Sequence, residues 1–283
     1  MLYDESFSNK YKDQLIDEKI GKIKLNKKVI VNALLTVLNI EKISPSFIRI
    51  QFSSDKPVNI DPLWICPYLK LLFPDPSTNV ITFPKLDDNN KIAVDDKQRQ
   101  LVRSYSVREF ERASNQFFVD FAIHDTGLAS VWSQKTKIGD QIGLIAAASK
   151  LRFTDNCLVL MGDISAVPAI CYTLEHLPQN QKAFAFIQVN HKSDIVPLPD
   201  NKNIKVNWFI QNRDNPFQLV DAVINADLSE QNKLWFWGGM ERSLAQSVRH
   251  AIKDKYIHLS PDAFHITSYW REGFAEGEFK HRE

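Results

Sequence analysis

Short stretches of alternating apolar and polar residues fill the first half of the chain. They are rich in β-branched and aromatic residues, and Pro-rich or polar segments separate them, which is typical of strands joined by turns. Strands are expected in residues 29–53, which would hold two, and in residues 63–73, 101–110, 116–125 and 140–147, with one short helix at 127–134. Six short strands without a long helix among them predict an antiparallel six-stranded β-barrel.

The pattern changes after about residue 153, where apolar runs alternate with segments of helical spacing. Strands are expected at residues 157–163, 182–190, 204–211, 234–239 and 264–270, and helices at 166–177, 217–228 and 244–256. Strands that alternate with helices indicate βαβ units and a parallel sheet.

We therefore predict a two-domain α+β protein. The first domain spans residues 1–152, with its barrel core at 29–152, and the second is an α/β parallel-sheet domain of nucleotide-binding type at 153–283. The charged residues 1–28 are expected to form a short helix or a loose arm.

Composition excludes several classes of protein. Glycine is scarce, at 9 of 283 residues, about 3% against a usual 7%, and neither G-x-G-x-x-G nor G-x-x-x-x-G-K-[ST] occurs. The 35 Lys+Arg and 34 Asp+Glu nearly cancel, so no overall field attracts nucleic acid or an anionic membrane. With no apolar signal core and no run near the ~18 apolar residues of a membrane span, we expect a soluble, cytoplasmic protein without membrane insertion.

Cysteine and histidine usage gives no metal motif. Cys66, Cys157 and Cys171 form no C-x-x-C pair, and their odd number argues against a disulfide framework or an iron–sulfur cluster. A reducing compartment fits best. Neither H-E-x-x-H nor G-x-S-x-G occurs, so no metal site and no hydrolase site is indicated.

The densest polar cluster reads R-S-Y-S-V-R at residues 103–108, in an expected strand. Alternation places Arg103, Tyr105 and Val107 on one face of that strand and Ser104, Ser106 and Arg108 on the other. Such residues suit a flavin, because an aromatic ring can lie against its ring system, a hydroxyl can reach a ring nitrogen, and guanidinium groups can pair with phosphates. An exposed edge strand with two solvated arginines is the alternative.

A second cluster follows where the strand ending at residues 120–124 meets a Gly-containing turn. A helix beginning after Gly127 would leave the backbone N–H groups of residues 128–130 without helical partners. Such a helix end can bind a pyrophosphate without several glycines. The alternative is an ordinary strand-to-helix turn with Asp125 or Thr126 as its N-cap.

The ordered motifs resemble those of the siderophore-interacting protein family, which are flavin-dependent ferric-siderophore reductases related to ferredoxin-NADP reductases. The motifs are Arg-x-Tyr-Ser-x-Arg at 103–108, Asp-Phe-x-x-His-x-x-Gly-x-Ala-Ser-x-Trp at 120–132, a Gly-Asp pair at 162–163 and Ser-Tyr-Trp-Arg-x-Gly at 268–273. The resemblance runs from about residue 29 to residue 274. It implies an FAD-binding antiparallel barrel followed by an α/β domain.

Carried over residue by residue, the resemblance implies a cofactor site in three parts. The flavin and its phosphates would contact Arg103, Ser104, Tyr105, Ser106 and Arg108; the second cluster would contribute Asp120, Ala122, His124, Thr126, Gly127, Leu128, Ala129, Ser130 and Trp132; and Tyr269, Trp270 and Arg271 would close over the flavin from the second domain. No catalytic side chain is implied, because the redox chemistry belongs to FAD.

The substrate that the resemblance implies is a ferric siderophore, whose iron is released by reduction during iron acquisition and enters only as a chelate. Many ferric chelates are anionic, so positive charge is expected beside the flavin. The candidates are Lys70, Arg271, Lys280 and Arg282. Lys70 lies in an otherwise apolar run, and a barrel lysine that extends to solvent is the alternative explanation for it.

Two segments of the second domain depart from the family pattern. Residues 162–169 read G-D-I-S-A-V-P-A where relatives commonly have G-D-E-T-A-x-P-A, and residues 238–241 read G-G-M-E where a Gly-Glu pair is usual. The donor therefore stays open between NADH or NADPH and a small iron–sulfur protein such as a ferredoxin. Two other functions stay open as well: a general NAD(P)H:flavin or ferredoxin reductase of the same fold, and a non-redox siderophore-binding protein.

Overall fold

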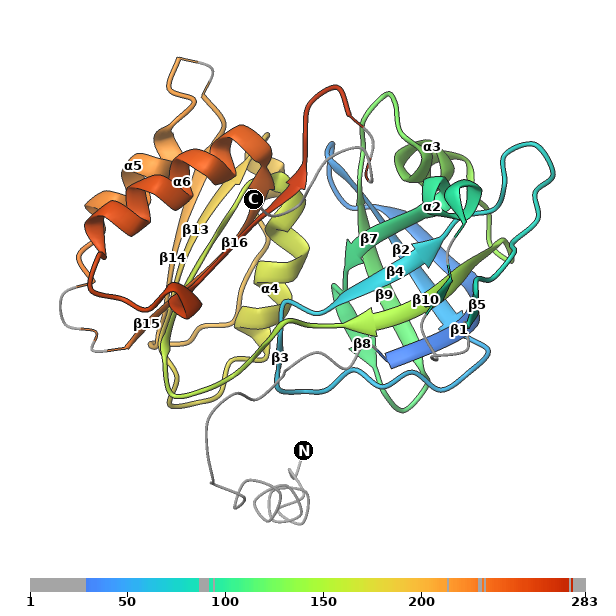
Figure 1. Ribbon diagram of the computed structural model, residues 1–283, viewed down its shortest axis with the longest axis horizontal. Helices are drawn as coiled ribbons and strands as arrows, with labels where there is room; N and C mark the ends of the chain where they lie inside the picture. Colours follow the sequence, from blue (N-terminus) through green and yellow to red (C-terminus); the bar gives the residue numbers. More distant parts are fainter. Residues whose placement is uncertain are drawn as a thin grey trace, which may run out of the picture.

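The chain folds into two sheet-based domains that lie side by side (Figure 1). The structure, a computed structural model, describes residues 29–86, 92–93, 95–212, 214–228, 231, 233–274 and 276. The helix or arm expected at residues 1–28 lies outside these ranges. An antiparallel sheet is followed by a parallel one with helices, which confirms the predicted α+β class.

The first domain is built on a seven-stranded antiparallel sheet, one strand more than expected, in the order β7-β4-β10-β1-β2-β9-β8. Its strands are β1 (Val29–Lys42), β2 (Phe47–Ser54), β4 (Tyr68–Leu72), β7 (Val102–Ser106), β8 (Glu109–Glu111), β9 (Gln116–Ala122) and β10 (Gln141–Ala148). The sheet curls, so that the ring of Tyr105 on the edge strand β7 reaches that of Phe121 on β9, with 4.5 Å between centroids. Phe52, Phe73 and Phe117 are fully buried inside the curl.

The single strand expected at residues 63–73 is two strands. β3 (Trp64–Ile65) pairs with β11 (Leu151–Arg152) in a separate two-stranded sheet, while β4 continues the barrel. Cys66 has a positive φ of 48°, and Pro67 has no N–H to donate to a ladder. The chain therefore turns at these two residues between the domains.

The second domain is a five-stranded parallel sheet in the order β14-β13-β12-β15-β16. Its elements are β12 (Cys157–Gly162), α4 (Val167–Glu175), β13 (Ala183–Val189), β14 (Ile204–Ile210), α5 (Gln218–Asn225), β15 (Leu234–Glu241), α6 (Arg242–Lys255) and β16 (Phe264–Trp270). Helices α5 and α6 cover one face, and α4 lies on the face toward the barrel (Figure 1). On that side the α4 residues Ala169 and Ile170 share a core with Phe47, Ile65 and Cys66 from the first domain.

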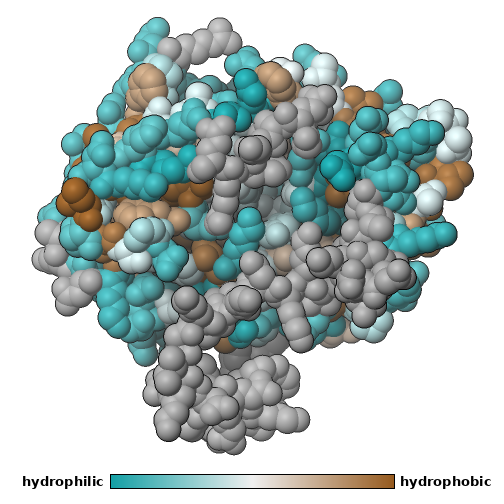
Figure 2. Space-filling model, in the orientation of Figure 1, coloured by the Kyte–Doolittle hydropathy of each residue, from teal (hydrophilic) through white to brown (hydrophobic). Residues whose placement is uncertain are grey.

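Small elements complete the described chain. They are β5 (Lys85–Leu86), β6 (Ile92–Ala93), α2 (Asp96–Leu101), α3 (Leu128–Lys135) and three 3-10 turns, η1 (Ile164–Ala166), η2 (Lys192–Asp194) and η3 (Pro261–Ala263). Among the helices within the described ranges, none combines the length and the hydropathy that a bilayer crossing requires. Hydrophilic residues cover most of the described surface visible in Figure 2, with apolar residues scattered among them.

Candidate functional site

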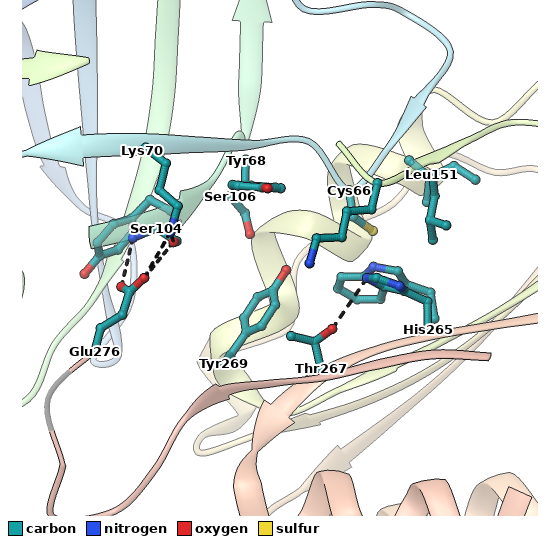
Figure 3. A pocket seen from close by; sticks show the side chains of 14 residues that line it. Cys66, Tyr68, Lys70, Ser104, Ser106, Leu151, His265, Thr267, Tyr269 and Glu276 are labelled. Carbon is teal, nitrogen blue, oxygen red and sulfur yellow. Dashed lines mark hydrogen bonds and ion pairs between the residues drawn. The ribbon is translucent and has the colours of Figure 1, made fainter. Parts of the chain in front are cut away.

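A cavity of about 140 Å³ lies between the barrel and the parallel sheet. In Figure 3 the labelled side chains of β4 and β7 project toward those of β16. The lining residues are Ile65, Cys66, Tyr68, Lys70, Ser104, Tyr105, Ser106, Lys150, Leu151, Trp237, His265, Thr267, Tyr269 and Glu276. The sequence-based candidates Lys70, Ser104, Tyr105, Ser106 and Tyr269 are thus brought to one place.

The register of two neighbouring barrel strands builds one wall of this cavity. Tyr68 on β4 pairs with Ser106 on β7, and Lys70 pairs with Ser104, two residues along each strand. The polar ends of these side chains therefore line one face of the sheet. The aromatic ring of Tyr105 packs against the barrel core, and shielding from water raises the pKa of its phenol.

Alternate residues of β16 build the opposite wall. His265, Thr267 and Tyr269 share one face of this strand, and the phenol of Tyr269 points toward Ser106 of the first domain (Figure 3). The ring of Tyr269 packs directly on Gly239, where an added Cβ would lie 2.9 Å from it. Glycine at this position therefore lets Tyr269 approach the barrel, and shielding from water raises the pKa of its phenol.

The turn between β9 and α3 forms a separate polar feature. The hydroxyl of Ser130 accepts from the backbone N–H of His124 at 2.9 Å and donates to its carbonyl at 2.8 Å, which fixes the turn. Gly127 is the N-cap, with φ of 97° and no side chain capping the helix. The start of α3 thus presents backbone N–H groups, the arrangement that binds anions at helix ends.

Both domains match models of known protein families. Residues 36–150 match the family model of a siderophore-interacting FAD-binding domain, and residues 156–273 match that of a siderophore-interacting protein. The chain belongs to the siderophore-interacting protein family. Its first domain is accordingly the FAD-binding domain of that family.

Similarity to individual proteins of the family supports this membership. The chain is 25% identical over 224 residues to the ferric vibriobactin reductase ViuB of Vibrio cholerae, covering 76% of this chain and 80% of the relative. It is 25% identical over 249 residues to the ferric acinetobactin reductase of Acinetobacter baumannii, covering 86% and 80%. A siderophore utilization protein from T. fusca has the same fold, with a TM-score of 0.75 at 22% identity, covering 91% of this chain and 99% of that one.

The residues of this siderophore-interacting protein fit FAD. Arg103 is half-buried, and its guanidinium bonds the backbone carbonyls of Gln100 and Val102 at 2.7 and 2.8 Å, while no carboxylate in the described ranges pairs with it. Its charge is therefore available to a phosphate. The backbone N–H groups at the uncapped start of α3 can bind a phosphate as well.

Gly127 tests the α3 part of this site. A Cβ at this position would lie 2.7 Å from Cε1 of His124, in a backbone conformation that L side chains rarely adopt. We expect Gly127→Ala to weaken FAD binding about tenfold, because relieving the clash displaces the start of α3. FAD titration followed by fluorescence quenching measures it.

Gly139→Ala is the matched control for that prediction. Gly139 has a similar φ of 92°, but nothing lies within 4 Å of its added Cβ. Both variants carry the ~1–2 kcal/mol penalty of the left-handed conformation, and only the Gly127 variant should lose FAD affinity. Equal FAD affinities in the two variants would remove the β9–α3 turn from the site.

Two residues expected at the cofactor are engaged elsewhere. Both terminal nitrogens of Arg108 bind the carboxylate of Glu175 on α4, at 2.6 and 2.7 Å, and Nε lies 3.9 Å from Asp120. Asp120 in turn accepts two hydrogen bonds from Arg49, at 2.7 and 2.9 Å. Arg108 and Asp120 therefore belong to an ion network that joins barrel and α4, and their expected role at the cofactor stays a prediction.

Three aromatic or basic candidates also lie away from the cavity. Trp132 packs in the barrel core, with its ring 5.4 Å from that of Phe73. Trp270 donates from Nε1 to Asp163 at 2.8 Å, and Arg271 lies over the ring of Phe274 at 3.7 Å. Neither Trp270 nor Arg271 lines the cavity. Ala122 packs at the edge of the core shared by the two domains, and Lys280 and Arg282 lie outside the described residues.

Carboxylates occupy two helix starts at the carboxyl edge of the parallel sheet. Asp163 accepts from the backbone N–H of Ser165 at 2.9 Å and from that of Glu241 at 2.7 Å, besides Trp270. Burial raises the pKa of Asp163, and these hydrogen bonds partly offset the rise. Glu241 caps α6 in the same way, through the N–H groups of Ser243 and Leu244.

Sequence reasoning missed several lining residues, above all Tyr68, His265, Thr267 and Glu276. Period-two spacing back from Tyr269 would have found Thr267 and His265. No sequence signal marks Glu276, since it follows the last strand without any periodic pattern. No group of three or more potential metal-ligating side chains occurs within the described residues.

Proposed function

We propose that the protein is an FAD-dependent ferric-siderophore reductase that releases iron by reducing Fe(III) in a chelate to Fe(II). The observation that carries this proposal is the cavity in which Ser104 and Ser106 of the FAD-binding domain lie opposite Tyr269 of the second domain, with Lys70 at its edge. The named ferric-siderophore reductases among its relatives support the same reaction.

The reaction follows from the coordination chemistry of iron. Siderophores bind Fe(III) through hard oxygen ligands, which hold the larger and less charged Fe(II) more weakly. One electron per iron therefore releases the metal. FAD, when bound, accepts electrons in pairs and passes them on singly.

The residues of this chain position the reactants. The hydroxyl of Ser106 would offer a hydrogen bond to the flavin from the end of β7. Arg103 and the start of α3 would bind the phosphates of FAD. Lys70 supplies positive charge for an anionic chelate, and the rings of Tyr269 and Trp237 exclude water from the other side. Iron needs no protein ligand in this scheme, because it stays in its chelate.

The electron donor is NADH, NADPH or a ferredoxin. The carboxylates of Asp163 and Glu241 cap the two helix starts where a nucleotide pyrophosphate would seek backbone donors. Negative charge at these positions disfavours a pyrophosphate there, which favours a ferredoxin. We further place the reaction in the cytoplasm: Cys66, Cys157 and Cys171 are buried free thiols, as is usual in reducing compartments.

Donor and acceptor are tested together. FAD-loaded protein is mixed with a ferric tris-catecholate and, in parallel, with NADH, NADPH or reduced ferredoxin, and Fe(II) is trapped by a chromogenic ferrous chelator. We expect Fe(II) to form with at least one donor and only when FAD is present. Fast donor oxidation with artificial acceptors but none with the ferric chelate would instead indicate a general reductase. Chelate binding without any effect of FAD would indicate a binding protein.

A further inference from the structure

The chain returns to the barrel after β16 and places a carboxylate at the edge of the cavity (Figures 1 and 3). Oε2 of Glu276 accepts from the backbone N–H of Ser104 at 2.9 Å, and Oε1 accepts from its hydroxyl at 2.7 Å. Oε1 also lies 3.4 Å from Nζ of Lys70. A residue that follows the second domain is thus held by three donors of the first.

The three donors are built by the barrel itself. Lys70 and Ser104 are cross-strand partners on β4 and β7, and the lysine ammonium also hydrogen-bonds the serine hydroxyl. The side chain of Lys70 is 26% exposed and that of Glu276 is 17% exposed. Solvent therefore screens this pair less than it screens a surface pair.

The carboxylate changes the charge that the cavity offers to a substrate. An anionic oxygen of a chelate and the carboxylate of Glu276 would compete for the same donors, Lys70 and Ser104. A chelate with several negative charges would in addition be repelled by the carboxylate, whereas a chelate without net charge would not.

We propose that Glu276 sets the charge selectivity of the cavity, by offsetting the charge of Lys70 and disfavouring strongly anionic chelates relative to uncharged ones. This inference rests on the proposed function, since it assumes that ferric chelates are the ligands. Glu276 acts in it as a specificity-determining residue for the chelate.

The test compares Glu276→Gln with Glu272→Gln. Both substitutions remove one carboxylate charge from the same segment, but Glu272 is exposed and does not line the cavity. The probes are redox-inert Ga(III) complexes of two hexadentate ligands: a tris-catecholate with three net negative charges, and a trihydroxamate without net charge. Calorimetric titration of the FAD-loaded protein gives the dissociation constants.

We expect Glu276→Gln to bind the tris-catecholate complex about tenfold more tightly, because a repulsive charge at short range is removed. Binding of the uncharged complex should stay within twofold, and Glu272→Gln should change neither. The gain should shrink at high salt. The double variant Lys70→Met/Glu276→Gln should bind the tris-catecholate complex no more tightly than the wild type, because the lysine that attracts the anion is gone.

Three results would overturn the inference: equal changes for both complexes, no change for either, or a gain that persists without Lys70. Failure of the proposed function looks different, because the FAD-loaded wild-type protein would then reduce neither ferric counterpart, whether or not it binds the Ga(III) complexes. Unchanged FAD content and thermal midpoint in Glu276→Gln establish that the variant folds.

Discussion

The substitution Arg103→Ala is expected to weaken FAD binding roughly 10- to 150-fold. The half-buried guanidinium bonds only backbone carbonyls in the described part of the chain, so its charge is available to a phosphate. Hydrogen bonds to charged groups contribute about 1.5–3 kcal/mol each, and every 1.4 kcal/mol is about tenfold in affinity. Fluorescence titration with FAD measures the loss.

Arg99→Ala is the matched control for this effect. Arg99 is exposed in the last turn of α2, and its removal takes away the same charge four residues earlier in the chain. FAD affinity should stay near that of the wild type. If both variants weaken FAD binding equally, general charge rather than a contact with Arg103 governs the affinity, and the assignment of Arg103 fails.

The substitution Glu175→Gln is expected to lower the free energy of unfolding by about 3–5 kcal/mol, the usual penalty for removing one partner of a buried ion pair. The side chain of Arg108 is 9% exposed and that of Glu175 is 23% exposed. Without the carboxylate charge, the one anionic partner left to the guanidinium among the described residues is Asp120, whose nearest oxygen is 3.9 Å away and already bonds Arg49. Urea unfolding measures the change.

Two further variants separate charge from packing in this prediction. Asp155→Asn removes a carboxylate from the exposed pair with Lys233 and should leave stability almost unchanged. Arg108→Met/Glu175→Leu replaces the whole pair by apolar side chains and should recover most of the loss. A Glu175→Gln protein as stable as the wild type would show that the network does not hold the domains together.

The strand pattern made the architecture predictable. Period-two alternation located the strands β1 and β2. The switch to alternating strand and helix segments located the parallel sheet. Alternation also placed Tyr105 and Ser104 on opposite faces of their strand, and in the structure the first packs against the barrel core and the second lines the cavity. Such local patterns work because each strand has one buried face, and burial is recorded in the sequence at every second residue.

Long-range pairing was not predictable in the same way. Arg108 looked like a phosphate ligand, and its partner Glu175 is 67 residues away on another domain. Glu276 is 172 residues from Ser104. Neither pairing leaves a periodic signal, because a single charged side chain can meet any residue that the fold brings within reach. The break at Cys66 and Pro67 was visible as a proline, but its role in separating β3 from β4 depends on the partner strand β11.

Single-turnover reoxidation tests the central claim most directly. FAD-loaded protein is photoreduced without oxygen and mixed with a ferric tris-catecholate and a ferrous trap, and flavin absorbance and Fe(II) are followed together. Ferric-siderophore reductase activity predicts that flavin absorbance returns at a rate that saturates with chelate concentration, with about two Fe(II) formed per FAD. Flavin that stays reduced in the presence of the chelate, and regains its absorbance only when oxygen is admitted, would contradict it.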